Sequence, residues 1–430
     1  METVPLGPED RAILALESDT VVGHTCKVIL VDRRAPGLAE LRAAVAERLG
    51  AVPALTRRLA GPPDAPAWAQ DDGFDVARHV VPGPVEAPLD RHELRAGVAR
   101  LFEQRLDRAH PLWRIDTLPL HGGGSALVWR IHHALADGTT AMRYARALLW
   151  DAGDTQHVER ASGSPPGASR AHPAAEHARD DARRRAHLAG FLHREFARSR
   201  RRSPFDGRIG TSRRLAFASV PLRELHDAAN ALDGATLNDA VLACVAGALR
   251  RWVEHHHGRL DAVRVKVPVS LHHEGDDALN RDSFFSLELP LADPDPVERL
   301  RSVHAATTVR KAEHDAERLE ALTRDLARVS PHLKDFCERI ERSPRRFAVN
   351  VSNVPGPRGP VTILAAPVEA LYSIAEIGEH HALRVAVVSL AGRLCFGFCA
   401  DPAIVDDLQA MAEGVETEAG ALIAAAGARA

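Results

Sequence analysis

Hydrophobic positions in the first 150 residues of the chain follow two different spacings. Continuous apolar runs of strand length alternate with stretches in which apolar residues recur every three or four positions, as on one face of a helix. One such stretch ends at Gly50, a residue type that commonly terminates helices. The pattern predicts strands at 24–32, 74–81 and 125–133, and helices at 37–50, 94–105 and 139–149. This order is typical of an α/β protein.

A change of composition separates the second half of the chain from the first. Residues 156–203 are rich in Arg, His, Ala, Pro and Ser, which favours a connecting segment. We therefore divide the chain into an N-terminal lobe (1–155), a basic linker (156–210) and a C-terminal lobe (211–430). The last is predicted to contain helices at 236–256, 295–315 and from 404 onward, and strands at 264–271, 283–291, 347–354, 383–390 and 394–401.

Charge and targeting signals exclude several classes of protein. The net charge of the 430 residues is only -3, so no overall positive field attracts nucleic acid. The N-terminus lacks the basic and apolar regions of a signal peptide, and no window of about 18 apolar residues predicts a membrane span. We expect a cytoplasmic protein that contacts a membrane or a lipid droplet only at its surface.

The five cysteines show no disulfide pattern. Cys395 and Cys399 are the closest pair, but they lie four residues apart in a predicted strand. That separation is about 13 Å, beyond the reach of a disulfide. Free thiols in a reducing compartment are the expected state.

The sequence HHALADG, from His132 to Gly138, carries the clearest chemical signal. Successive strand residues face opposite sides, so the two imidazoles are poorly placed to bind one metal, and we predict no metal site. Asp137 and Gly138 are expected to form a turn, with Gly138 at positive φ and Thr139 or Thr140 capping the next helix. An imidazole titrates near neutral pH and therefore suits a general base. The alternative is a pair of ordinary histidines satisfied at a strand end.

A second candidate lies at the start of the helix predicted from residue 236. Thr236 and Asp239 have nearly the spacing and chemistry of a capping box, with Asp in place of the usual Glu. Asn238, between them, has a further interpretation, in which its side chain reaches the site and stabilises substrate or an oxyanion. The two interpretations are compatible, and both stay open.

HHALADG matches the HHxxxDG motif of the CoA-dependent acyltransferase superfamily. The chain as a whole resembles the bacterial wax ester synthase/acyl-CoA:diacylglycerol acyltransferase family, beginning with PLGPEDRAILALES near the N-terminus. Further matching segments follow in the expected order over nearly the whole chain: HTCKVILVD, FDVARHVV, HPLW, RRLAFASVPL, ATLNDAVLACVAGALRRW, VPVSL, DPVERLRSVHAAT, VSNVPGP and FGFCAD.

The resemblance implies two acyltransferase-like lobes, each a mixed β-sheet with helices, with a channel between them. It implies that His133 is the general base, taking the hydroxyl proton of diacylglycerol or a long-chain alcohol that attacks acyl-CoA. The products would be triacylglycerol or wax ester, with acyl-CoA as co-substrate and no cofactor. His132 would support the site, Asp137 would pair with an arginine that the sequence does not identify, and Gly138 would form the turn.

Three further signatures of the family have matches in this chain. Asn238 and Asp239 correspond to its substrate or oxyanion signature. The other two signatures are segments in which proline fixes φ or glycine permits a tight turn, and they are expected to hold the channel walls. They comprise Pro111, Leu112 and Trp113, and Asn353, Pro355 and Gly356.

Several positions depart from the family pattern. Lys27 stands in a predicted strand where the family has small residues, and it shares a face with Ile29 and Val31. Its ammonium must either extend to the strand end or meet an anionic group. His380 and His381 have no counterpart. These departures keep open a polar specialised metabolite as acceptor.

Other properties stay open at the level of sequence. A catalytically silent homologue that binds lipid or acyl-CoA is a further alternative, against which the intact HHxxxDG motif argues. The arginine-rich stretch 179–214 is either a solvated helix face or a contact for lipid headgroups or CoA phosphates. The sequence does not indicate acyl chain length, oligomeric state or the strength of membrane association.

Overall fold

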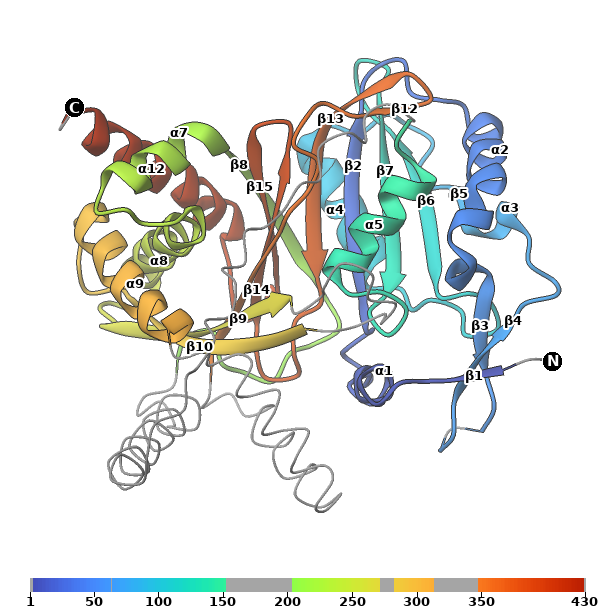
Figure 1. Ribbon diagram of the computed structural model, residues 1–430, viewed down its shortest axis with the longest axis horizontal. Helices are drawn as coiled ribbons and strands as arrows, with labels where there is room; N and C mark the ends of the chain where they lie inside the picture. Colours follow the sequence, from blue (N-terminus) through green and yellow to red (C-terminus); the bar gives the residue numbers. More distant parts are fainter. Residues whose placement is uncertain (1–2, 63, 152–202, 271–281, 313–346, 429–430) are drawn as a thin grey trace, which may run out of the picture.

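The computed structural model describes residues 3–62, 64–151, 203–270, 282–312 and 347–428. Two six-stranded sheets lie side by side, with helices packed against each (Figure 1). A small three-stranded sheet lies near the N-terminus, beside α1 (Pro8–Leu14). Its strands are β1 (Thr3–Pro5), β4 (Ala67–Gln70) and β3 (Arg57–Ala60). The mixed α/β class and the two sheet-containing lobes predicted from sequence are confirmed.

The first large sheet contains the strand that carries the histidine pair. Its order is β12 (Thr362–Ile363), β13 (Ala366–Ala375), β2 (His24–Val31), β7 (Ser125–His132), β6 (Trp113–Pro119) and β5 (Val80–Pro82). All neighbours are antiparallel except β5 and β6. Helix α4 (Arg91–Phe102) covers one face, where the Arg130 guanidinium donates to the Leu101 carbonyl at 2.6 Å. Helices α2 (Leu38–Arg48) and α5 (Gly138–Leu148) lie on the other side (Figure 1).

The second large sheet is built from the C-terminal half alone. Its order is β10 (Asp282–Pro290), β9 (Ala262–Ser270), β11 (Val349–Val354), β14 (Leu383–Leu390), β15 (Arg393–Ala400) and β8 (Arg214–Pro221). The helices of this lobe are α7 (Leu222–Ala231), α8 (Leu237–His256), α9 (Pro296–Ala312) and α12 (Leu408–Gly427). Glu418 of α12 is buried and pairs with Arg299 of α9 and with Arg251 of α8, so a buried carboxylate joins three helices.

The C-terminal half also contributes two strands to the first sheet. Strand β13 pairs antiparallel with β2, placing Ser373 opposite Lys27. Asp151, just after α5, accepts hydrogen bonds from the backbone amides of Leu364 (3.0 Å) and Ala365 (2.7 Å) and from the Thr362 hydroxyl (2.7 Å). The sequence division into lobes at 155 and 211 did not anticipate this extension, because strand pairing across 340 residues leaves no local pattern.

One predicted strand is wrong in part. Residues 76–79 of the predicted strand 74–81 form the short helix α3 (Val76–His79), and only β5 follows as a strand. The Asp75 carboxylate caps this turn by accepting the Ala77 amide at 2.9 Å, so a local side-chain contact outweighs the apolar run. The other predicted strands and helices that lie in the described residues have counterparts with bounds within a few residues of those predicted, whereas β6, β8, α7 and β13 were not predicted.

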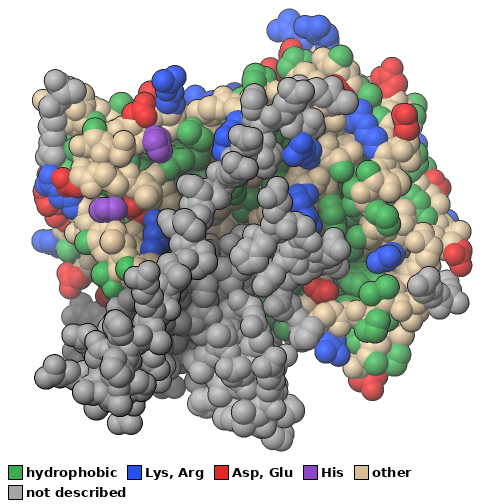
Figure 2. Space-filling model, in the orientation of Figure 1, with side chains coloured by type: hydrophobic (Ala, Val, Ile, Leu, Met, Phe, Trp, Pro, Cys, Tyr) green, Lys and Arg blue, Asp and Glu red, His purple; other side chains and the backbone are tan. Residues whose placement is uncertain are grey.

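Four of the five cysteines lie in the described residues, and all four are free and buried: Cys26, Cys244, Cys395 and Cys399. Cys395 and Cys399 lie in β15, as predicted. Cys337, most of the basic linker and most of the arginine-rich stretch fall outside the described residues. Within the described ranges, no helix is both long and apolar enough to cross a bilayer. On the face shown in Figure 2, basic and acidic side chains are scattered among one another, which agrees with the small net charge.

Candidate active site

The histidine pair lies where β7 gives way to the turn before α5. The backbone amide of His132 donates to the Leu112 carbonyl at 2.9 Å, and that of His133 donates to the Gly23 carbonyl at 2.9 Å. The pair is therefore held through its backbone from both sides, by β6 and by the segment that precedes β2.

The ring of His132 is bound to the protein through both nitrogens. Its Nδ1 accepts the Ala134 amide hydrogen at 3.1 Å, and its Nε2 lies 3.0 Å from a carboxylate oxygen of Glu17. A nitrogen that accepts an N–H carries no proton of its own, so the network assigns the proton to Nε2, which donates it to Glu17. These are contacts of the kind that a supporting residue makes.

His133 has a different environment. Burial and the nearby charge of Arg384 together lower the pKa of its imidazole to about 4, although the charge of Asp137 acts in the opposite direction. The Nδ1 atom is buried and has no hydrogen-bond partner among the described residues. The ring is consequently neutral at physiological pH, which is the form that accepts a proton.

Asp137 is fully buried and begins α5. Its carboxylate accepts the Thr140 amide at 2.6 Å, which makes Asp137 the N-cap. The prediction that Thr139 or Thr140 caps this helix is wrong, since the aspartate one turn earlier takes that place. Gly138 is not at positive φ, so the predicted conformational reason for a glycine there is also wrong. A Cβ on Gly138 would lie 3.0 Å from the Val354 side chain, so close packing is the actual constraint.

That contact brings the NVPGP segment of the second lobe against the HHxxxDG turn. Asn353 lies at the end of β11. Its side-chain nitrogen Nδ2 donates a weak hydrogen bond of 3.5 Å to the side-chain oxygen Oδ1 of Asn238, and this bond joins two predicted site residues. Gly356 donates its amide to the Ser389 hydroxyl at 2.9 Å, and a Cβ there would overlap the Ser389 carbonyl. The structure thus gathers residues 133–138, 238 and 353–356 at one junction of the two lobes.

The capping box predicted at Thr236 and Asp239 is confirmed. The Thr236 hydroxyl accepts the Asp239 amide at 3.3 Å, and the Asp239 carboxylate accepts the Thr236 amide at 2.9 Å. The same carboxylate also contacts His304 (2.8 Å) and Thr307 (2.6 Å) of α9. Burial by itself would raise the pKa of Asp239, but hydrogen bonds from Thr307 and His304 outweigh it and lower the pKa. Asp239 therefore braces α8 against α9, and its predicted role toward substrate stays a prediction.

The Pro111–Trp113 segment supports the start of β6. The Trp113 indole donates to the Leu55 carbonyl at 2.7 Å and stacks on His79 with ring centroids 4.5 Å apart. Leu112 contributes the carbonyl that holds His132. All three residues of the segment are buried, and a role of the segment as a channel wall stays a prediction.

Lys27 is buried, with 1% exposure, and does not extend to the strand end. Its ammonium donates to the Ser373 hydroxyl at 2.7 Å. Burial lowers the pKa of Lys27 to about 8, while the charges of Asp137 and Arg384 act on it in opposite directions. Because Asp137 and Arg384 also influence His133, these four groups lie within one electrostatic neighbourhood. Arg384 is accordingly our candidate for the predicted arginine partner of Asp137.

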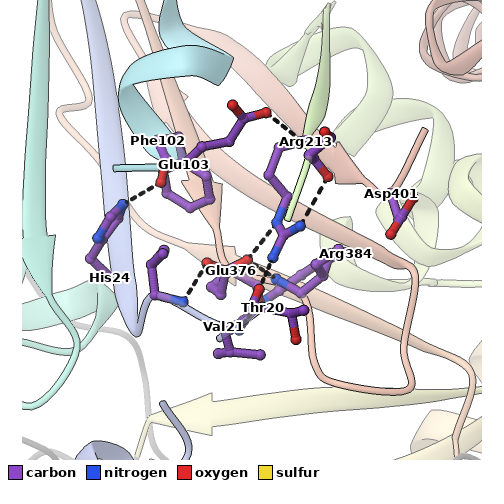
Figure 3. Close-up of polar contacts among 12 residues, drawn as sticks. Thr20, Val21, His24, Phe102, Glu103, Arg213, Glu376, Arg384 and Asp401 are labelled. Atoms are coloured by element: carbon purple, nitrogen blue, oxygen red, sulfur yellow. Dashed lines mark hydrogen bonds and ion pairs between the residues drawn. The ribbon is translucent and has the colours of Figure 1, made fainter. Parts of the chain in front are cut away.

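Sequence reasoning missed an ion-pair network behind the site, shown in Figure 3. Arg213, just before β8, pairs with Glu376 at 2.9 Å, and both side chains are buried. Glu376 accepts the Val22 amide at 3.2 Å, while Arg213 donates to the Thr20 carbonyl. Burial raises the pKa of Glu376 although Arg213 opposes it. This network fixes the segment before β2 against the second lobe. The only nearby sequence signal was the pair His380 and His381, which has no counterpart in the family pattern.

The histidines 380 and 381 lie between β13 and β14. The ring of His381 stacks on Phe347 with centroids 4.2 Å apart, and the His380 carbonyl accepts the Gly207 amide at 3.3 Å. These contacts hold the loop that enters the second sheet. A role for the two residues in shaping an acceptor pocket stays a prediction.

Solved structures with the same architecture define the class. The wax ester synthase/diacylglycerol acyltransferase from Marinobacter aquaeolei VT8 superposes with a TM-score of 0.72 over 99% of this chain and all of its own, at 23% identity. The first condensation domain of the CDA synthetase superposes with a TM-score of 0.61, covering 98% of this chain and 96% of its own at 16% identity. At such identities the likeness concerns the fold, which is that of the two-lobed, condensation-domain-like acyltransferases.

The sequence comparisons are more specific. Residues 6–241 match the model of the wax ester synthase/diacylglycerol acyltransferase catalytic domain, and residues 280–422 match the C-terminal domain of that family. A probable diacylglycerol O-acyltransferase of Mycobacterium tuberculosis is 29% identical over 441 residues, covering 95% of this chain and 94% of the relative. The chain belongs to the wax ester synthase/diacylglycerol acyltransferase family and is an acyltransferase, so the resemblance predicted from sequence is confirmed.

Proposed function

We propose that the protein transfers a fatty acyl group from acyl-CoA to the hydroxyl of diacylglycerol or a long-chain alcohol, with His133 as general base. The observation that carries this proposal is the environment of His133. Its imidazole is kept neutral by burial and by Arg384, at the junction where signatures of both lobes meet. Family membership supports the reaction type.

The proposed reaction needs only alignment and proton transfer. The alcohol oxygen attacks the thioester carbonyl carbon while the His133 imidazole takes the hydroxyl proton. The tetrahedral intermediate then breaks its C–S bond, and the imidazolium returns the proton to the departing CoA thiolate. We assign stabilisation of the oxyanion to the Asn238 side-chain amide, which is supported by its contact with Asn353 at the junction of the lobes. A thioester is already activated, so the chemistry requires no metal or redox cofactor.

Product analysis tests the proposal directly. Purified protein is incubated with labelled palmitoyl-CoA and a pool of diacylglycerol, hexadecanol and polar alcohols, and the labelled products are identified by mass spectrometry. A labelled triacylglycerol or wax ester supports the proposal, whereas label only in hydrolysed fatty acid contradicts it. Diacylglycerol resides in lipid surfaces, so the proposal includes peripheral contact with a membrane or lipid droplet from the cytoplasm, which vesicle flotation measures.

The pKa of His133 sets a pH dependence for this reaction. The catalytic form is the neutral imidazole, so kcat/KM should rise with pH through about 4 and stay level above pH 6. An unperturbed histidine would place that midpoint near 6.5. Rate profiles from pH 3.5 to 8, with circular dichroism in parallel to confirm folding, distinguish the two. A midpoint near 6.5 in folded protein would contradict the lowered pKa of His133 in the reacting enzyme.

Lys27 favours a second candidate acceptor, a polar or acidic alcohol. An ammonium in the electrostatic neighbourhood of His133 stabilises a negative group on the acceptor and disfavours a purely apolar one. Lys27→Met removes the charge and keeps the length of the side chain. We expect it to raise the rate with hexadecanol relative to polar alcohols by about tenfold.

The control for this test is Lys311→Met, which removes an exposed lysine at the end of α9. Competition assays with paired acceptors report the preference independently of total activity. An unchanged ratio in Lys27→Met would leave the neutral-lipid acceptor as the better assignment.

A further inference from the structure

We infer that Glu17 is a positioning residue, whose carboxylate holds the ring of His132 and thereby the backbone turn that carries His133. The inference rests on the proposed function, because it concerns the base of that reaction. Glu17 follows α1 and stands 115 residues before His132, and sequence reasoning did not single it out.

The ring of His132 links Glu17 to the residue that follows His133. Its Nε2 donates to Glu17 at 3.0 Å, and its Nδ1 accepts the Ala134 amide at 3.1 Å. Only the tautomer with the proton on Nε2 makes both bonds. His133 lies between residue 132, whose ring is fixed by Glu17, and residue 134, whose amide is fixed by that ring. The orientation of the His133 side chain therefore depends on the contact of Glu17 with the ring.

Glu17 is held as a charged acceptor. Its side chain is 11% exposed and pairs with Arg105 at 2.8 Å and Arg108 at 2.6 Å. Burial by itself would raise the pKa of Glu17, but hydrogen bonds from His132 and Arg108 outweigh it and lower the pKa. The carboxylate stays ionised near neutral pH and cannot act as a donor, which excludes the other tautomer of His132.

The segment around Glu17 is shaped to approach the ring. Gly23 has a φ of +75°, and a Cβ there would lie 2.6 Å from His132 Nε2, so the backbone passes too close for another residue. The Gly23 carbonyl accepts the His133 amide at 2.9 Å. Glu17 thus holds His132 by its ring, and Gly23 holds His133 by its backbone amide.

The middle of this segment is fastened separately. Val22 and Thr20 are bonded to Glu376 and Arg213, from the second half of the chain (Figure 3). Removing the Glu17 side chain leaves those contacts and the Gly23 carbonyl in place. The effect of Glu17 on catalysis is therefore separable from the fold of the segment.

The test compares Glu17→Ala and Glu17→Gln with Asp19→Ala, which removes an exposed carboxylate from the same segment. Glu17→Ala should lower kcat by about 10²-fold with little change in either KM, because the base is misplaced while the substrate sites stay intact. Glu17→Gln should recover most of the rate, since its amide oxygen can accept the same Nε2 proton. Asp19→Ala should match wild type.

A double-mutant cycle shows whether Glu17 acts through His132. Adding Glu17→Ala to His132→Ala should cause no further loss of kcat. Three results would each overturn the inference. The losses of kcat from the two substitutions could multiply in the double mutant, the kcat of Glu17→Ala could stay within twofold of wild type, or Glu17→Gln could be no more active than Glu17→Ala.

Nitrogen-15 NMR spectra of protein with labelled histidine report the tautomer of His132 and need no enzymatic activity. The signal of His132 is identified because it is missing from the spectrum of His132→Ala. Wild type should show His132 protonated at Nε2 alone, and Glu17→Ala should show a mixture of tautomers. An unchanged single tautomer in Glu17→Ala would overturn the inference. Wild-type protein that shows this tautomer but forms no ester would refute the proposed function while leaving the hold on the ring demonstrated.

Discussion

Replacing His133 with alanine should lower kcat/KM for acyl transfer by about 10²- to 10⁴-fold while the protein stays folded. General-base catalysis by a positioned side chain contributes about that factor. The buried Nδ1 of the ring has no hydrogen-bond partner among the described residues, so removing the ring breaks no hydrogen bond at that atom within them. Initial rates with labelled acyl-CoA and the preferred alcohol measure the loss of kcat/KM. A thermal melt of the variant shows whether the protein stays folded.

Two histidine variants calibrate this result. His132→Ala should lose less activity, since that ring contacts Glu17 and Ala134 and acts through the turn. His226→Ala removes an exposed histidine on α7 and should match wild type. Near wild-type turnover by His133→Ala would refute the general-base assignment. Acyl-CoA binding without turnover by the wild type would instead favour the silent lipid-binding alternative.

Replacing Asp137 with alanine should cost both stability and activity. Loss of the N-cap bond to Thr140 alone costs about 1 kcal/mol. Removing one member of a buried charge group costs more, on the order of 3 kcal/mol. Without this carboxylate the pKa of Lys27 should fall below its present value of about 8, since the Asp137 charge raises it. We expect Tm to fall by roughly 3–5 °C and acyl transfer to be lost with the turn.

Asparagine separates the two contributions of Asp137, because Asp137→Asn keeps a capping oxygen and removes only the charge. Asp75→Ala is the matched control, as it removes an aspartate N-cap of the short helix α3. It should change activity little. If Asp137→Ala loses activity with an unchanged Tm, the carboxylate has a direct catalytic role and the structural assignment fails.

Features with a local physical cause were readable from the sequence. The apolar runs predicted β2 and β7, and the three- and four-residue spacing predicted α2 and α8, because a strand or helix buries one face or stripe of its own residues. The capping box at Thr236 and Asp239 followed from a spacing of three residues. The HHxxxDG motif indicated the CoA-dependent acyltransferase superfamily, and the ordered series of further segments indicated the family, whose resemblance implied the candidate base.

Features that depend on contacts between distant segments were decided only by the tertiary structure. Strand β13 joins the first sheet, Glu17 reaches the ring of His132, and Arg213 pairs with Glu376 across 163 residues. Lys27 is buried against Ser373, which lies 346 residues further along the chain. Each outcome depends on which distant segments meet in the folded chain, and hydrophobic periodicity indicates that a face is buried without specifying its partner. The sequence therefore determined most of the local elements and the candidate base, whereas tertiary packing determined the contacts around that histidine and the direction in which its pKa is shifted.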